Sequence, residues 1–122
     1  MSLDDTTFLA AITGCTLPAS EFGHRQHLRL ASLHLQAAPL EVAIERTCAD
    51  ITRFAAHHGA HAKFHRTITE ALLRLMAARG PEDAALLDDA RGLLARHYSP
   101  TLLTSPEARL RFIQPDLLPL PA

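Results

Sequence analysis

Histidines at helical spacing are the residues of this 122-residue sequence that are best suited to chemistry. His24 and His27 are three positions apart, and His61 and His65 are four positions apart. Residues three or four positions apart lie on the same side of an α-helix, so each pair can bring two imidazoles to one point. Histidine is the most common metal ligand among side chains. The spacing therefore predicts a metal site, provided that both pairs face one interior.

The apolar pattern indicates that both pairs point inward. At 100° per residue, His24 falls on a line of apolar residues and His27 lies beside that line. This first stripe consists of Leu28, Ala31 and Leu35. His61 and His65 belong to a second stripe, which consists of Phe64, Ile68, Leu72 and Leu75. We expect the two pairs to converge inside a helical bundle, where inward ligands from facing helices can hold an ion.

The expected cofactor is a single divalent metal ion, either zinc, iron, nickel or copper. The candidate ligands are His24, His27 and His65, with His61 as a further candidate. A carboxylate-bridged pair of irons is disfavoured, because Glu70 falls well off the apolar stripe. Glu21 is a candidate fourth ligand or general base.

Two hypotheses of function follow from these residues. The first is a metal-dependent enzyme with an open coordination position for water or a small-molecule substrate, suited to hydrolysis or oxygen chemistry. Lys63 and Tyr98 are then candidate acid–base residues or hydrogen-bond partners near the metal. The alternative is a noncatalytic helical homodimer or interaction module, whose histidines form a buried polar network and whose C-terminal tail clasps the partner.

Helices dominate the expected fold, because β-branched runs, hairpin turns and period-two alternation are nearly absent. The expected helices span 5–12, 20–36, 39–58, 61–79 and 82–96, and two short helical pieces follow at Ser99-Pro100 and Ser105-Pro106. The sequence thus predicts an all-α irregular bundle of about five helices in a single domain, 1–122. The proline-rich tail, 114–122, is expected to be ordered and packed through Leu117, Leu118 and Leu120 against the bundle or a second subunit.

Composition limits the partners and the compartment. The net charge is −1 and no basic run is present, so a nucleic-acid partner is not expected. No apolar stretch approaches the roughly 20 residues that cross a bilayer, so no membrane partner is expected. The first residues, MSLDDTTFLAAI, are acidic where a secretory signal peptide is positively charged, which favours a cytoplasmic protein. Cys15 and Cys48 are too far apart for a zinc ribbon or a thioredoxin-type motif, so they are expected to be buried thiols.

Three stretches carry a resemblance to a family: EFGHRQHLRLASLHL, KFHRTITEALLRLM and HYSPTLLTSPEARLRFIQPDLLPLP. They resemble an uncharacterised family of small bacterial all-helical proteins, with the motifs F-x-H-x-x-H-L, K-[YF]-H-x-T-I-T and P-D-L-x-P-L-P. The matching residues are Phe22, His24, His27, Lys63, Phe64, His65, Thr67, Thr69, Pro115 and Asp116. His61 lies outside the pattern, so the resemblance favours His24, His27 and His65 as the core of the site. It implies a helical fold and names no reaction or substrate.

Overall fold

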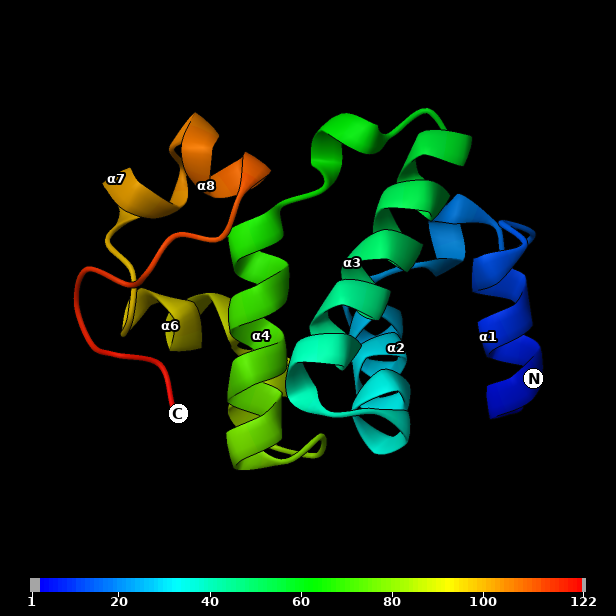
Figure 1. Cartoon of the computed structure of the whole chain (residues 1–122), viewed down its shortest axis with the longest axis horizontal. Coiled ribbons are helices and arrows are strands. Elements are labelled where there is room, and N and C mark those ends of the chain that lie inside the picture. The colour runs from blue at the N-terminus through cyan, green and yellow to red at the C-terminus, as the bar shows by residue number, and fades with distance from the viewer. Residues whose placement is uncertain (1–2, 122) are drawn as a thin grey trace. The chain divides into compact units, whose positions relative to one another are not determined.

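The computed structural model describes residues 3–121, apart from the side chain of His61. Its regular structure consists of α-helices and short 3-10 turns, and the described residues contain no β-strand. The predicted all-α fold is therefore confirmed (Figure 1). The chain separates into two compact units, one up to Phe64 and one from His65 onward. A single domain over 1–122 stays a prediction.

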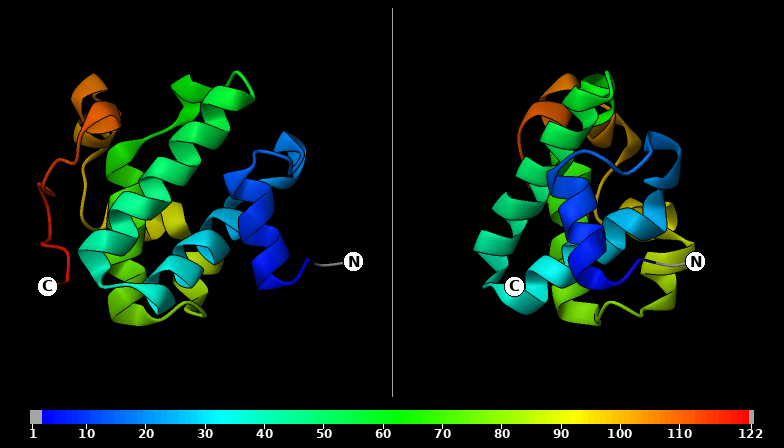
Figure 2. Two further views of the ribbon diagram at one scale, coloured as in Figure 1. Left: turned by 45° about the vertical axis from the view of Figure 1, so that its right-hand side comes forward. Right: turned by 90° about the vertical axis from the view of Figure 1, so that its right-hand side faces the viewer.

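The first unit is built on a helical hairpin. Its elements are α1 (Asp5–Thr13), η1 (Ala19–Glu21), α2 (His24–Ala37), α3 (Leu40–His57) and η2 (His61–Lys63). α2 and α3 pack against each other, and α1 packs against α3 (Figure 2). Their apolar faces meet in a core of Phe8, Ile12, Leu17, Leu30, Ile51 and Phe54. Burial of these side chains is the main source of stability for helices of this length.

The start of α2 differs from the prediction. The expected helix over 20–36 begins too early: Ser20, a residue type that often caps helices, lies within η1, and α2 begins only at His24. Gly23 is the capping residue, and its backbone N–H donates to Oε1 of Gln26 at 3.0 Å. His24 is therefore in the first turn of the helix and is exposed to solvent. The other helix start in this unit was predicted well, since the Asp4 side chain accepts from the backbone N–H of Thr7 at 2.8 Å.

The second unit is arranged around its longest helix. Its elements are α4 (Arg66–Arg79), α5 (Ala84–Asp88), α6 (Ala90–Ala95), α7 (Pro100–Leu103) and α8 (Pro106–Leu110). α4 packs against α5, α6 and α8. The expected helix over 82–96 is interrupted at Asp89, whose side chain instead accepts from the N–H of Gly92 and caps α6. Ser99 and Ser105 cap α7 and α8, each with proline next in the chain, as predicted.

α4 also begins later than expected. The predicted helix over 61–79 is divided into η2 and α4, and His65 stands just before α4 as its N-cap. Nδ1 of His65 accepts from the backbone N–H of Ile68 at 3.1 Å, which satisfies one of the free donors of the first turn. His61 and His65 therefore do not lie on one helix. In the described part of the chain, no helix is both long and apolar enough to cross a membrane.

Candidate functional site

The predicted metal centre is wrong. Among the described residues, no group of three or more His, Cys, Asp or Glu side chains is placed to hold a metal ion. The prediction assumed two histidine pairs at i,i+3 and i,i+4 on inward helix faces. Both helices begin later than that assumption required, so His24 is exposed and His65 precedes its helix. The side chain of His61 lies outside the described residues. The hypothesis of a metal-dependent enzyme that uses these histidines is therefore wrong as well.

His65 shows why a histidine in a helical motif need not be a ligand. Its Nδ1 accepts from the N–H of Ile68, and its Nε2–H donates to the carbonyl oxygen of Leu103 at 2.8 Å. One ring nitrogen therefore accepts and the other donates, which is the pattern of a neutral imidazole. Neither nitrogen has a lone pair left for a metal. His65 joins the start of α4 to the end of α7.

His27 is held within the first unit by its own local contacts. Its Nδ1–H donates to the carbonyl oxygen of Gly23 at 2.8 Å, and its ring stacks on Phe22 with centroids 4.0 Å apart. Burial lowers the pKa of His27, the hydrogen bond to Gly23 opposes that effect, and the neighbouring His24 adds to the lowering. These contacts favour a neutral, packed ring at this position.

The alternative of one buried histidine network is not what the contacts show. His34 on α2 donates from Nε2 to Oδ2 of Asp50 on α3 at 2.7 Å, and this hydrogen bond joins the two helices of the hairpin. His97 donates from Nδ1 to the carbonyl oxygen of Leu118 at 2.9 Å. The hydrogen bonds of His27, His34, His65 and His97 each go to a separate group rather than to another histidine.

The three candidate acid–base residues lie in different settings. Glu21 is exposed in η1, and Lys63 is exposed at the end of η2. Tyr98 is buried in the second unit, and its hydroxyl donates to the carbonyl oxygen of Ile113 at 2.7 Å. Acid–base roles for Glu21 and Lys63 stay predictions. Tyr98 has a structural contact instead.

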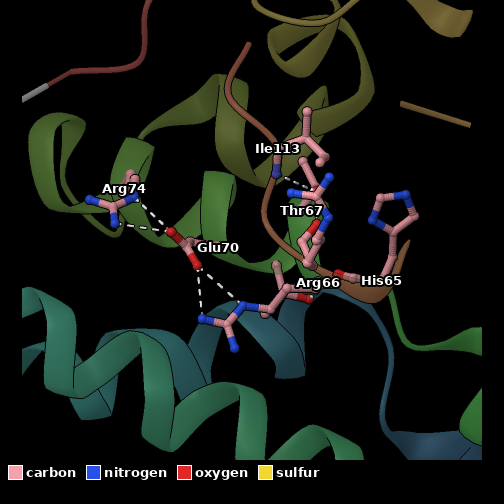
Figure 3. Close-up of polar contacts among 8 residues, drawn as sticks. His65, Arg66, Thr67, Glu70, Arg74 and Ile113 are labelled. Carbon is pink, nitrogen blue, oxygen red and sulfur yellow. Dashed lines mark hydrogen bonds and ion pairs between the residues drawn. The ribbon is translucent and has the colours of Figure 1, made fainter. Parts of the chain in front are cut away.

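Tyr98 belongs to a group of polar residues that hold the C-terminal segment, residues 111–121. We call Thr67, His97, Tyr98 and Ser99 the cradle. The hydroxyl of Thr67 donates to the carbonyl oxygen of Arg111 at 2.9 Å and accepts from the N–H of Ile113 at 3.1 Å. Figure 3 shows Thr67 directed from α4 toward Ile113. Because Thr67 is fully buried, its two bonds lie away from solvent.

The rest of the cradle holds the segment farther along. The backbone carbonyl of His97 accepts from the N–H of Leu117 at 3.0 Å, and the imidazole binds the next residue, Leu118. The backbone N–H of Ser99 donates to Oδ1 of Asp116 at 2.8 Å. Segment and cradle are thus joined through main-chain groups and one carboxylate. The irregular, proline-containing backbone, which bends at Asp116–Leu118 and cannot form a helix, has several of its main-chain polar groups satisfied in this way.

Burial, hydrogen bonds and nearby charges shift the pKa values of Tyr98 and Asp116. Burial raises the pKa of Tyr98 to about 12, and the nearby carboxylates of Glu70 and Asp116 add to that effect while Arg74 opposes it. The hydrogen bonds from Ser99 hold the pKa of Asp116 below its usual value. At neutral pH the tyrosine is a proton donor and the aspartate is an acceptor, as their hydrogen bonds require.

Glu70 is a buried residue whose role the sequence analysis missed. It was placed off the apolar stripe of its helix, yet its side chain is only 6% exposed. Arg66 donates to Oε1 at 2.9 Å and Arg74 donates to Oε2 at 3.0 Å, so the two arginines flank the carboxylate from the turns before and after it (Figure 3). The sequence contained a signal for this contact, because Glu70 has one arginine four positions before it and another four positions after it.

The tail is ordered through its backbone rather than through its leucines. Leu117 and Leu118 do not pack within the chain, because they are 54% and 55% exposed, and their packing against a second subunit stays a prediction. Leu120 is half-buried. The cradle explains how the segment can be held in place while two of its apolar side chains remain in solvent.

Comparisons with known proteins give no relative: no family model, no curated protein and no solved structure matches this chain. The resemblance to small bacterial helical proteins stays a prediction, and the candidate site therefore has to be judged from its own geometry.

Proposed function

We propose that this protein is a self-association module, in which Leu117 and Leu118 of the C-terminal segment bind a second copy of the chain. One observation carries the proposal: the cradle fixes the backbone of the segment, while these two leucines stay 54% and 55% exposed. An apolar group held in place by an ordered backbone loses little conformational entropy on binding. Exposed apolar side chains on a fixed segment are typical of a protein contact surface.

The charges near the segment favour a second copy over a strongly charged partner. Glu107 and Asp116 are acidic, Arg109 and Arg111 are basic, and all four are exposed in the second unit. A surface with equal numbers of both signs can be complementary to itself, as an interface around a two-fold axis requires. The net charge of −1 gives two copies little mutual repulsion.

The exposed surfaces of Leu117 and Leu118 also set the expected affinity of the dimer. Burial of a whole leucine side chain contributes about 1.5 to 3 kcal/mol, so the exposed halves of four leucines contribute roughly 3 to 6 kcal/mol. If the rest of the interface offsets the cost of association, this energy corresponds to a weak dimer, with a Kd between about 40 μM and about 6 mM.

Sedimentation velocity over a wide concentration range tests the proposal. We expect a concentration-dependent monomer–dimer equilibrium for the unaltered chain and monomer alone for the double variant Leu117→Asp/Leu118→Asp. The matched control is Val42→Asp, which adds an acid at another exposed apolar position, in the first turn of α3, where a negative charge is tolerated. This control should dimerise as the unaltered chain does.

Circular dichroism establishes that each variant is folded. The proposal is overturned if no dimer is detected at about 1 mM of the unaltered chain, because a Kd of about 6 mM would still place about a fifth of the chains in dimers at that concentration. It is equally overturned if the leucine variant associates as strongly as the control.

A further inference from the structure

The cradle binds the C-terminal segment as a peptide-binding site binds a ligand. The hydroxyl groups of Thr67 and Tyr98 bond to main-chain groups of Arg111 and Ile113. His97 bonds to the main chain of Leu117 and Leu118. Contacts of this kind recognise the path of a backbone and depend little on its side chains.

One side chain of the segment adds specificity. Oδ1 of Asp116 accepts from the backbone N–H of Ser99, which is the N-cap of α7. Pro115 stands directly before this aspartate, where it fixes its own φ angle and favours an extended conformation at Gln114, and the backbone then bends at Asp116–Leu118. The ligand chemistry is therefore a bent peptide that carries a Pro-Asp pair followed by leucine.

We propose that the cradle is a site for a Pro-Asp-Leu peptide that bends at the aspartate, which is occupied by the chain's own segment and can also be occupied by the same segment from a second copy. The hydrogen bonds join cradle and segment alone, so they are identical whether the segment is from the same chain or from another. Exchange of an identical element between copies is a low-cost route to association. The inference does not rest on the leucine contact proposed above, because a protein that is monomeric at low concentration would still have the cradle.

The attached segment competes with any added peptide. A segment on a short link has an effective concentration in the millimolar range, so the unaltered chain should bind free peptide weakly. Asp116→Ala removes the acceptor for the Ser99 N–H from the attached segment and leaves the four cradle residues unchanged. The site should then become available to a peptide that still carries the aspartate.

The test uses the full chain and a fluorescent synthetic peptide with the sequence of residues 111–121, capped at both ends. Fluorescence anisotropy measures its binding to the unaltered chain and to the Asp116→Ala chain. We expect the variant to bind the peptide about tenfold more tightly than the unaltered chain does, because its own segment competes less well. A peptide that itself carries Asp116→Ala should bind the variant about tenfold more weakly than the unaltered peptide does.

Asp83→Ala is the matched control for general destabilisation. Asp83 also accepts from a backbone N–H, that of Leu86 at 3.1 Å, but it caps α5 and has no contact with the cradle. This control should bind the peptide no better than the unaltered chain does. If Asp116→Ala does not fold, Asp116→Asn keeps a neutral acceptor at the same position and should give a smaller gain in the same direction.

Three outcomes overturn the inference. The first is equal peptide affinity for the Asp116→Ala chain and the Asp83→Ala control, and the second is equal affinity of the two peptides for the Asp116→Ala chain. The third is no binding of the peptide at about 1 mM, because a site that accepts an attached segment should be measurably filled at that concentration. The leucine variant distinguishes the two proposals. A leucine variant that still dimerises overturns the leucine contact, and the cradle site then stands if the peptide binds as expected. A monomeric leucine variant together with no peptide binding supports the leucine contact alone.

Discussion

Replacement of Thr67 by valine tests how the C-terminal segment is held. Valine keeps the shape of threonine and removes the hydroxyl, which bonds to the Arg111 carbonyl at 2.9 Å and to the Ile113 N–H at 3.1 Å. Two hydrogen bonds at about 1 kcal/mol each give a loss of about 2 kcal/mol. If the two backbone groups remain buried without partners, the loss rises to about 4 kcal/mol. We expect the free energy of unfolding of the second unit to fall by about 2 to 4 kcal/mol.

Thr47 provides a matched control in the same protein. It is a buried helical threonine like Thr67, but its hydroxyl is one of the buried polar atoms without a hydrogen-bond partner in the described structure. Thr47→Val removes an unsatisfied polar group, so it should be neutral or stabilising by up to about 1 kcal/mol. The two substitutions make the same chemical change, and only the hydrogen bonds differ.

Urea unfolding followed by tyrosine fluorescence and by circular dichroism is the assay. Tyr98 is the only tyrosine and the chain has no tryptophan, so fluorescence reports the second unit specifically. Hydrogen exchange at the Ile113 amide gives a local measurement, and its protection should fall in Thr67→Val. Equal unfolding free energies for the two variants, together with unchanged protection of Ile113, would refute the reasoning.

Further predictions follow from the contacts of Tyr98, Asp50 and Glu70. Tyr98→Phe should lower stability by about 1 to 3 kcal/mol, because the carbonyl of Ile113 loses its buried donor. Because the pKa of Tyr98 is raised to about 12, its contribution is complete below pH 10 and should be lost between about pH 10 and 12, as a spectrophotometric titration with unfolding data at each pH will show. Burial of Asp50 acts to raise its pKa, but hydrogen bonds from His34 and an arginine outweigh this and lower it. Asp50→Asn should therefore destabilise the first unit at pH 7, and the difference from the unaltered chain should vanish in acid-denaturation curves as the pH falls through the lowered pKa of Asp50. Glu70→Leu should cost about 2 to 4 kcal/mol in urea unfolding, whereas replacement of the glutamate and both of its arginines by apolar residues should cost far less.

Local signals in the sequence predicted the helix caps correctly where neighbouring residues suffice. Asp4, Ser99 and Ser105 each bond to a backbone N–H three residues ahead. Such contacts are complete within one turn, so the sequence contains both partners close together. The start of α2 was predicted four residues too early, because Ser20 is an equally good local capping residue and the competing turn η1 was not recognised.

The role of the histidines depended on contacts that no local pattern shows. His65 was assigned to a metal site on helical spacing, yet it caps α4 and binds a carbonyl 38 residues away. An imidazole can be a ligand, a cap or a hydrogen-bond partner, and the choice depends on which groups the fold places within about 3 Å of each nitrogen. Spacing alone therefore could not decide the chemistry.

By itself, the sequence determined that this chain is all-α, because helical periodicity and capping residues act over three or four positions. Which distant groups these helices bring into contact depends on the tertiary structure. The hydroxyl of Thr67 reaches Ile113, which is 46 residues away, and the exposed leucines of the tail are fixed by hydrogen bonds of their backbone rather than by their side chains. Hydrogen bonds between distant segments form only when folding brings the donor and the acceptor together, and main-chain groups that are common to all residues carry no sequence pattern by which such a contact can be predicted.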